Sequence, residues 1–183
     1  MFSPLNVITI EPATRLAPKM ASADFVTDTV RVVKTDGRTA AQLEQRFGQP
    51  VIVCDVTAGP EAWSRIAFAA SKKVSTEMVD RFVASVASRG AAATRLPDWP
   101  GLVVMRTVAM LANEAFEAAL QGVATEADID VAMRHGVNYP KGPIEWARDL
   151  GLSRVLAVLD NIHALTGDPR YRASFGLRVA AQE

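Results

Sequence analysis

Histidine, cysteine and closely spaced glycines are scarce in this sequence, and each shortage excludes a type of site. The 183 residues include two histidines, His135 and His163, and one cysteine, Cys54. The histidines have no companion ligands at the helical or hairpin spacing that a metal needs, so we expect no metal site. A single thiol cannot form an internal disulfide, and we therefore expect a protein of the reducing cytoplasm.

The glycines do not form a phosphate-binding loop. There are 11 of them, and none lies two residues from another. A dinucleotide site needs G-x-G-x-x-G so that backbone amides can approach the pyrophosphate, and a P-loop needs G-x-x-x-x-G-K. Because neither pattern occurs, we expect no dinucleotide site formed by this chain alone.

Neither sign of charge dominates. Residues 1–96 hold 12 Lys/Arg and 9 Asp/Glu, whereas residues 97–183 hold 8 and 11. Such a small asymmetry gives no reason to expect nucleic acid or an anionic membrane as a partner. Charged and amide side chains interrupt the long apolar segment 102–121, which predicts a buried or dimer-facing helix rather than a membrane span. The N-terminal residues lack the features of a secretory signal.

The apolar pattern changes near residue 97 and predicts an α/β part, 1–96, followed by an all-α part, 97–183. In the first part the patterning predicts helices at 40–46 and 75–90 and strands at 6–10, 30–34, 51–54, 65–70 and 91–96. The order strand, helix, strand predicts a βαβ unit within a parallel or mixed sheet.

The second part is expected to be helical throughout. Pro and Gly residues at 97–101 break the chain before the helix 102–121. Thr125 and Asp128 resemble a capping box that opens a helix ending at Gly136. Pro143 suits the first turn of a further helix that runs to Leu150-Gly151, and an apolar stripe predicts another from 152 to 166.

Three polar side chains interrupt the apolar helix 102–121. Arg106 and Asn113 are seven residues apart and share one helix face, and Glu114 follows directly. Buried polar groups require partners, so these residues either form a structural network or meet a ligand or a neighbouring domain. Elsewhere, His135 is expected to stabilise a helix C-terminus, and Asp98 to cap or position a turn.

The order of motifs after residue 97 is distinctive. A helix opens with Pro100-Gly101-Leu102-Val103-Val104-x-Arg106 and contains Asn113-Glu114-Ala115; then come Gly122-Val123-Ala124, Asp128-Ile129-Asp130, Gly136-Val137-Asn138-Tyr139-Pro140-Lys141-Gly142-Pro143 and Gly167-Asp168-Pro169-Arg170-Tyr171-Arg172. This order resembles the C-terminal helical domain of 3-hydroxyacyl-CoA dehydrogenases. The resemblance is nearest to the second, C-terminal copy of that domain in the long 3-hydroxybutyryl-CoA dehydrogenases of the phenylacetate pathway.

The resemblance implies a fold. Residues 97–183 would form a helical domain similar to the C-terminal domain of 6-phosphogluconate dehydrogenase, which serves substrate closure and dimerisation. Residues 1–96 would be a truncated Rossmann-like domain, too short for the complete NAD domain of the family. The four residues Tyr139, Pro140, Gly142 and Pro143 match the family and are expected to shape a loop between helices.

The resemblance also implies a mechanism whose requirements this chain does not meet. The family transfers hydride between its substrate and NAD with a His–Glu pair as base, and both members lie in the NAD domain. Residues 1–96 contain no histidine. A family asparagine that holds the substrate oxygen corresponds to Met105, which cannot hydrogen-bond an alkoxide usefully. Arg106 of the same pattern is retained.

We therefore expect a related protein that is non-catalytic alone, with no catalytic residue and no cofactor of its own. Its role would be substrate-domain packing or dimerisation, as a homodimer through the helical domain or with a separate polypeptide that carries the NAD domain. Met105, Arg106, Asn113 and Glu114 are the candidate substrate-binding or inter-domain residues. An exposed apolar face of helix 102–121 would mark the partner surface; its residues would be Leu102, Met105, Ala109, Ala112 and Phe116.

Two alternatives remain open on the sequence. One is a stand-alone module that binds acyl-CoA or another small ligand, with Lys72-Lys73 and Arg106 as the candidates for contacting the CoA phosphates. The other is an active NAD-dependent dehydrogenase with an atypical nucleotide site.

Overall fold

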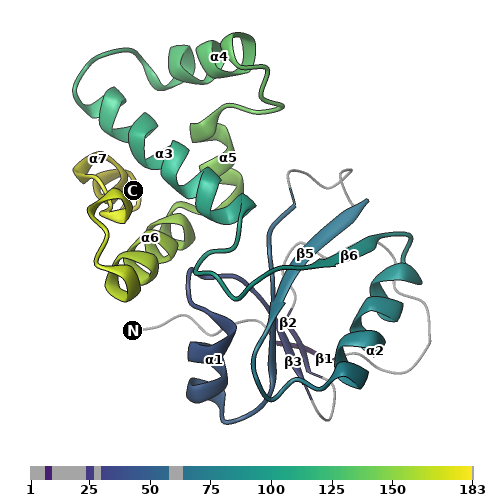
Figure 1. Ribbon diagram of the computed structural model, residues 1–183. Coiled ribbons are helices and arrows are strands. Elements are labelled where there is room, and N and C mark those ends of the chain that lie inside the picture. The colour runs from purple at the N-terminus through teal and green to yellow at the C-terminus, as the bar shows by residue number, and fades with distance from the viewer. Residues whose placement is uncertain (1–6, 10–23, 27–29, 58–63, 183) are drawn as a thin grey trace. The chain divides into compact units, whose positions relative to one another are not determined.

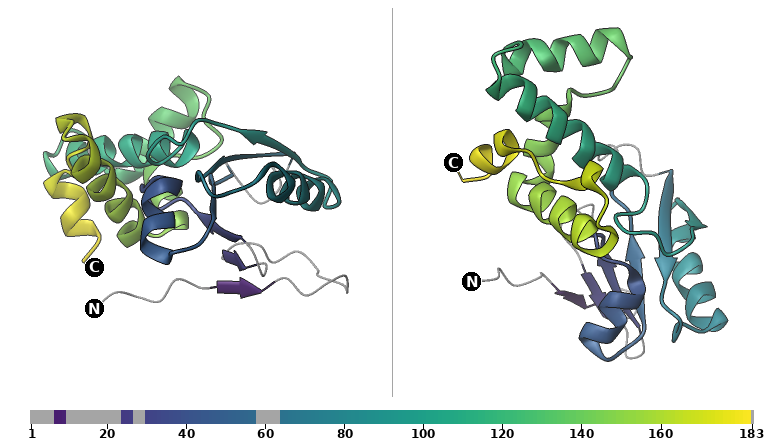
Figure 2. Two further views of the ribbon diagram at one scale, coloured as in Figure 1. Left: turned by 60° about the horizontal axis from the view of Figure 1, so that its bottom comes forward. Right: turned by 60° about the vertical axis from the view of Figure 1, so that its left-hand side comes forward.

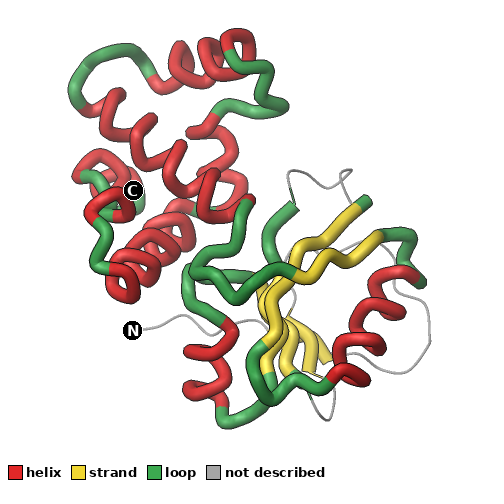
Figure 3. Tube along the Cα trace, viewed as in Figure 1, coloured by secondary structure: helices red, strands yellow, loops and turns green. Residues whose placement is uncertain are grey.

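The structure is a computed structural model that describes residues 7–9, 24–26, 30–57 and 64–182 (Figure 1). The chain forms two compact units. The first extends to Thr35 and resumes at Thr39–Leu102, and the second consists of Asp36–Arg38 and Val103–Glu183. Strands occur in the first unit, whereas the second is helical (Figure 3).

The first unit contains a six-stranded mixed sheet in the order β1-β2-β3-β4-β5-β6. The strands are β1 (Val7–Thr9), β2 (Asp24–Val26), β3 (Arg31–Lys34), β4 (Val51–Cys54), β5 (Arg65–Ala70) and β6 (Ala92–Arg95). Pairing is parallel for β1/β2, β3/β4 and β5/β6, and antiparallel for β2/β3 and β4/β5. The expected mixed sheet is confirmed, but β2 was not predicted, and residues 6 and 10 of the first expected strand lie outside the described residues.

Helices α1 (Ala40–Phe47) and α2 (Thr76–Ala87) cover opposite faces of this sheet (Figures 1 and 2). Successive strand residues point to opposite faces, so each strand contributes side chains to the apolar cores on both sides of the sheet. Val33 and Val53 pack with Leu43 of α1, whereas the neighbouring Ile52 packs with Phe82 of α2. The strand–helix–strand unit β5-α2-β6 is parallel, as its sequence predicts.

The helical unit is built around one long helix. Its elements are α3 (Val104–Leu120), α4 (Glu126–Gly136), α5 (Pro143–Leu150), α6 (Leu152–Thr166), the 3-10 turn η1 (Pro169–Tyr171) and α7 (Phe175–Ala180). Helix α3 contacts each of the other four α-helices. Thr125 caps α4 and Pro143 opens α5, as expected. The sequence did not predict α7, whose six residues are too few for a helical period to be recognised.

The apolar face that the sequence assigned to a partner is instead buried within the chain. Met105, Ala109 and Ala112 are inaccessible to solvent, and Phe116 is 3% exposed. Leu102 lies before α3 and packs in the core of the first unit with Val33 and Leu43. The expectation of an exposed face here is wrong, because α5, α6 and α7 pack around α3 and make it the central helix of its unit.

The short segment Asp36–Arg38 packs with the helical unit. The Asn161 side-chain amide donates to the Asp36 carbonyl at 2.9 Å. Gly37 has a φ of +96°, and a Cβ at this position would lie 2.4 Å from the Val158 carbonyl oxygen. Only glycine allows both the backbone conformation and the close approach to α6. Among the described residues, no helix is both long and apolar enough to cross a membrane.

Candidate functional site

Asn113 connects the middle of α3 to the segment that precedes α7. It is 4% exposed. Its side-chain oxygen accepts a hydrogen bond from the Ser174 amide at 2.7 Å, and its side-chain amide donates to the Arg172 carbonyl at 3.3 Å. The Ser174 hydroxyl donates in turn to the Asn113 carbonyl at 3.0 Å. The sequence left open whether Asn113 belongs to a structural network or meets a ligand or neighbouring domain. Because its side-chain hydrogen bonds go to the protein backbone, Asn113 belongs to a structural network.

The other candidates on α3 do not converge with Asn113. Met105 is buried, Arg106 is half-buried, and Glu114 is exposed. Across the described part of the chain, no hydrogen bond or ion pair holds the Arg106 side chain. The structure therefore does not assemble these four residues into one site.

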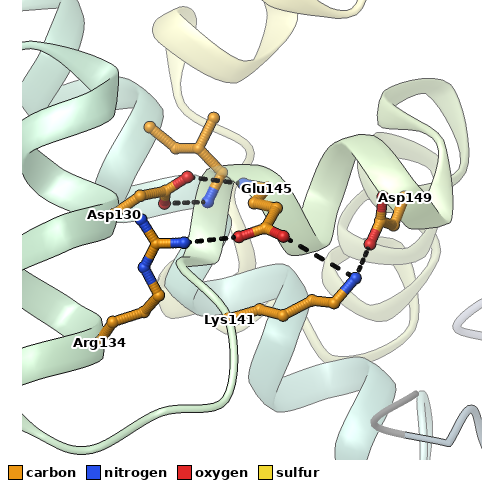
Figure 4. A network of polar contacts seen from close by, with 6 residues as sticks. Asp130, Arg134, Lys141, Glu145 and Asp149 are labelled. Atoms are coloured by element: carbon orange, nitrogen blue, oxygen red, sulfur yellow. Dashed lines mark hydrogen bonds and ion pairs between the residues drawn. The ribbon is translucent and has the colours of Figure 1, made fainter.

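The loop before α5 is shaped by its contact with Asp130 of α4 (Figure 4). The two carboxylate oxygens of Asp130 accept from the amides of Ile144 and Glu145, each at 2.9 Å. A Cβ on Gly142 would lie 2.1 Å from the Asp130 side-chain carbon, so glycine is required for this cap. Pro143 occupies the first turn of α5, where no amide hydrogen is needed.

Charged side chains continue this contact between α4 and α5. Arg134 pairs with Glu145 at 3.2 Å, and Lys141 lies 3.9 Å from the same carboxylate (Figure 4). Lys141 also pairs with Asp149, and the hydrogen bond to that carboxylate raises the pKa of Lys141. Tyr139 packs edge-on against Trp146 with ring centroids 6.4 Å apart. Pro140 is exposed beside them. All these contacts hold helices together.

Asp98 caps α1 from a distant part of the sequence. Its two carboxylate oxygens accept from the amides of Ala40 at 2.7 Å and Ala41 at 2.9 Å. The Thr39 hydroxyl accepts from the Gln42 amide at 3.1 Å, which completes the first turn. The sequence predicted a cap or a turn for Asp98 but could not identify the helix, since Asp98 is 58 residues from Ala40 and 57 from Ala41.

A groove that the sequence did not predict lies between α3, α7 and the beginning of α4. Its volume is about 270 Å³, and its lining residues are Phe116, Ala119, Leu120, Ala124, Thr125, Glu126, Gly176, Val179 and Ala180. Three large apolar side chains at or near these residues face solvent: Leu120 is 49% exposed, Val123 74% and Phe175 67%. This concentration of exposed apolar side chains is the strongest sign of a partner surface in the helical unit.

Close packing of α7 on α3 places Gly176, the residue after Phe175, in the lining of this groove. A Cβ on Gly176 would lie 2.3 Å from the Phe116 carbonyl oxygen. The Gly176 amide donates to the Glu117 carboxylate at 3.0 Å. This hydrogen bond, with a second one from Gln121, lowers the pKa of Glu117.

Within the described ranges, no cluster of three or more His, Cys, Asp or Glu side chains has the geometry of a metal site. His135 lies in the last turn of α4 and His163 in the last turn of α6, where a cation suits the helix dipole.

Two protein-family models match the chain. The model of the 3-hydroxyacyl-CoA dehydrogenase C-terminal domain matches residues 101–182. The model of the 3-hydroxybutyryl-CoA dehydrogenase reduced Rossmann-fold domain matches residues 32–100. The two matched ranges meet between residues 100 and 101. The two compact units divide after Leu102. The apolar pattern of the sequence placed the boundary between the α/β part and the all-α part near residue 97.

Similar proteins are named as dehydrogenases of particular 3-hydroxyacyl-CoA compounds. A 3-hydroxyadipyl-CoA dehydrogenase of Escherichia coli is 39% identical over 155 residues, which are 84% of this chain and 32% of that protein. A probable 3-hydroxybutyryl-CoA dehydrogenase of Deinococcus radiodurans is 39% identical over 85 residues, 46% of this chain and 31% of its own length. The crystal structure of an Escherichia coli 3-hydroxybutyryl-CoA dehydrogenase superposes with a TM-score of 0.82 and 33% identity, covering 100% of this chain and 38% of that one.

This chain therefore spans about a third of the length of the curated relatives it matches. The two family models together account for residues 32–182, and they match the sheet unit and the helical unit respectively. The chain belongs to the 3-hydroxyacyl-CoA dehydrogenase family.

Proposed function

We propose that this chain is a non-catalytic part of a 3-hydroxyacyl-CoA dehydrogenase, and that it packs against, or dimerises with, the polypeptide on which hydride transfer takes place. The observation that carries the proposal is the Asp98 carboxylate at the N-terminus of α1. In Rossmann-like folds the amides at such a strand–helix turn receive the pyrophosphate of the dinucleotide.

NAD, the cofactor of the family, does not fit this turn. The amides of Ala40 and Ala41 already bond to the Asp98 carboxylate, and the amide of Gln42 bonds to Thr39. A pyrophosphate would have to displace a carboxylate and would be repelled by it. The turn also lacks the G-x-G-x-x-G pattern that allows backbone and pyrophosphate to approach closely.

The catalytic groups of the family have no counterpart that the geometry supports. Residues 1–96 contain no histidine. Met105 has neither a hydrogen-bond donor nor solvent access. The Asn113 side chain already makes hydrogen bonds to the backbone that precedes α7. These observations support a role in packing rather than in proton or hydride transfer.

The groove beside Phe175 supports an association role for the helical unit. Leu120, Val123 and Phe175 together expose on the order of 300 Å² of apolar surface, which association would remove from water. The partner is a second copy of this chain or a separate polypeptide with the NAD domain. The single thiol, Cys54, is consistent with action in the cytoplasm.

An NADH-oxidation assay with acetoacetyl-CoA, followed at 340 nm, tests the proposal. We expect no turnover by the purified chain above a blank prepared from a strain without its gene. A 3-hydroxybutyryl-CoA dehydrogenase with a complete NAD domain is the positive control. Turnover that copurifies with the chain through two chromatographic steps would overturn the proposal and require a nucleotide site of another kind.

A further inference from the structure

We propose that α4 is a lid, held to the helical unit by charged contacts, which detaches and opens the groove between α3 and α7. Helix α4 lies at the periphery of its unit and is joined to α3 and α5 by one loop at each end (Figures 1 and 2). This inference goes beyond the proposed function and does not depend on it, since it concerns a motion of this chain alone.

Helix α4 adds no buried side chain to the core of its unit. Alone among the described α-helices, it contains no buried residue. Even α7, with six residues, buries Leu177 completely. Val131 within α4 and Val137 at its end are 45% and 52% exposed. A helix of 11 residues is only marginally stable in water by itself, so α4 depends on its contacts with the other helices.

The contacts that attach α4 to α5 are charged and open to water. The Asp130 carboxylate accepts from two amides of α5, and Arg134 pairs with Glu145 (Figure 4). A second ion pair joins Glu126 to Arg148 at 2.6 Å. The four side chains of these two pairs are 41–52% exposed. Dissolved salt screens exposed ion pairs far more than buried contacts, so the attachment of α4 weakens as the salt concentration rises.

The backbone on both sides of α4 suits a hinge. Gly122 has a φ of +70°, and nothing lies within 4 Å of the position that a Cβ would take there. Asn138 has a φ of +57°, in the left-handed region that residues other than glycine rarely adopt. Hinges consist of a few loop residues, next to the ends of an element, that absorb the change in backbone angles. Gly122 and Asn138 flank α4 and meet this description.

Detachment of α4 widens the groove. Ala124, Thr125 and Glu126 form the wall that belongs to α4 and the turn before it. The other walls belong to α3 and α7, which contact each other directly and do not require α4. When α4 leaves, the groove opens over Phe116 and Leu120 while these two helices stay in place. The charged contacts between α4 and α5 therefore control access to an apolar face of α3.

Hydrogen–deuterium exchange of the full chain, read by mass spectrometry, tests the proposal. A helix as short as α4 does not persist alone, so its amides exchange whenever it detaches. At about 50 mM NaCl we expect peptides from α4 to exchange at least about a hundredfold faster than peptides from α6, which buries four side chains. The ratio of the two rates should rise about threefold at about 500 mM NaCl.

Two variants test the contacts themselves. Asp130→Ala removes the acceptor of two α5 amides and should raise exchange in α4 about tenfold, although alanine favours the helical conformation. Arg148→Gln changes α5 and leaves the sequence of α4 intact, and it should raise exchange in α4 about threefold by removing the pair with Glu126. Glu114→Ala is the matched control. Glu114 is exposed on α3, and its replacement removes the same charge as Asp130→Ala but should leave exchange in α4 unchanged.

Equal exchange in α4 and α6 would overturn the proposal, because α4 would then open only when the whole unit unfolds. A ratio that does not change with salt would overturn it too, as would a rise of the same size in both helices of Asp130→Ala. Thermal unfolding checks that each variant folds, and Arg148→Gln decides if Asp130→Ala does not fold. None of these outcomes bears on the NADH-oxidation assay, so the two proposals fail separately.

Discussion

Asn113 and Ser174, which are 61 residues apart in the sequence, bind each other at two points. The Ser174 amide donates to the Asn113 side chain, and the Ser174 hydroxyl donates to the Asn113 carbonyl. Ser174 also caps α7 by accepting from the Leu177 amide at 3.2 Å. The position of α7, and hence of the groove beside it, therefore depends on a buried asparagine of α3.

Replacing Asn113 should destabilise the helical unit. Asn113→Ala leaves the Ser174 amide and the Arg172 carbonyl without their partner in a partly buried place, at a cost of about 1–2 kcal/mol in the free energy of unfolding. Urea denaturation followed by circular dichroism measures the change. Glu114→Ala, on the exposed neighbouring position, should change the same quantity by less than about 0.5 kcal/mol. Equal effects of the two variants would contradict the assigned role.

Gly37 should tolerate substitution less well than Gly48. Gly37→Ala combines a positive φ with a Cβ that lies 2.4 Å from a backbone oxygen of α6, and we expect a loss of about 3 kcal/mol. Gly48→Ala is the control, because Gly48 also has a positive φ, of +70°, but nothing lies within 4 Å of its Cβ position. It should lose only about 1 kcal/mol. Thermal unfolding of both variants gives the comparison.

The Asp130 cap should contribute more to stability than the ion pairs around it. Asp130→Ala removes the acceptor for two amides of α5 and should cost about 1–2 kcal/mol. Asp149→Ala removes only a pair with Lys141 in which the Asp149 side chain is 52% exposed, and it should cost less than about 1 kcal/mol. A larger loss for Asp149→Ala, measured by urea denaturation, would show that the ion pair matters more than the cap.

Acid should weaken the attachment of α7 through Glu117. The hydrogen bond from Gly176 lowers the pKa of Glu117 in the folded chain below its ordinary value of 4.5, so the unfolded chain binds the proton more tightly. The stabilisation is present above pH 4.5 and is lost as the pH falls through the lower, folded pKa. Glu117→Gln should therefore reduce the dependence of the unfolding free energy on pH in this acidic range. An unchanged pH dependence would mean that the bond to Gly176 does not discriminate between the two protonation states.

The sequence predicted local features of the fold better than long-range ones. The caps at Thr125 and Pro143 depend on residues within one turn of the helix they start, and both are confirmed. The partner of Asp98 lies in α1, and that of Asn113 lies before α7, so neither could be identified without the tertiary fold. The same reason explains the wrong prediction for the apolar face of α3, since periodicity shows that a face is apolar but not what covers it.

If the chain associates with itself, the groove beside Phe175 should control that association. The exposed apolar surface there would bury on the order of 600 Å² in a symmetric pair, which favours association by about 15 kcal/mol before a comparable loss of translational and rotational freedom. A weak dimer, with a dissociation constant of roughly 10–100 µM, is therefore expected in sedimentation velocity across a concentration series.

Phe175→Glu should leave the chain monomeric, because it places a charge in the apolar contact. Val137→Glu is the matched control: Val137 is 52% exposed at the other end of α4, and this variant should retain the wild-type association. A chain that stays monomeric at every concentration would exclude the homodimer and leave the polypeptide with the NAD domain as the proposed partner.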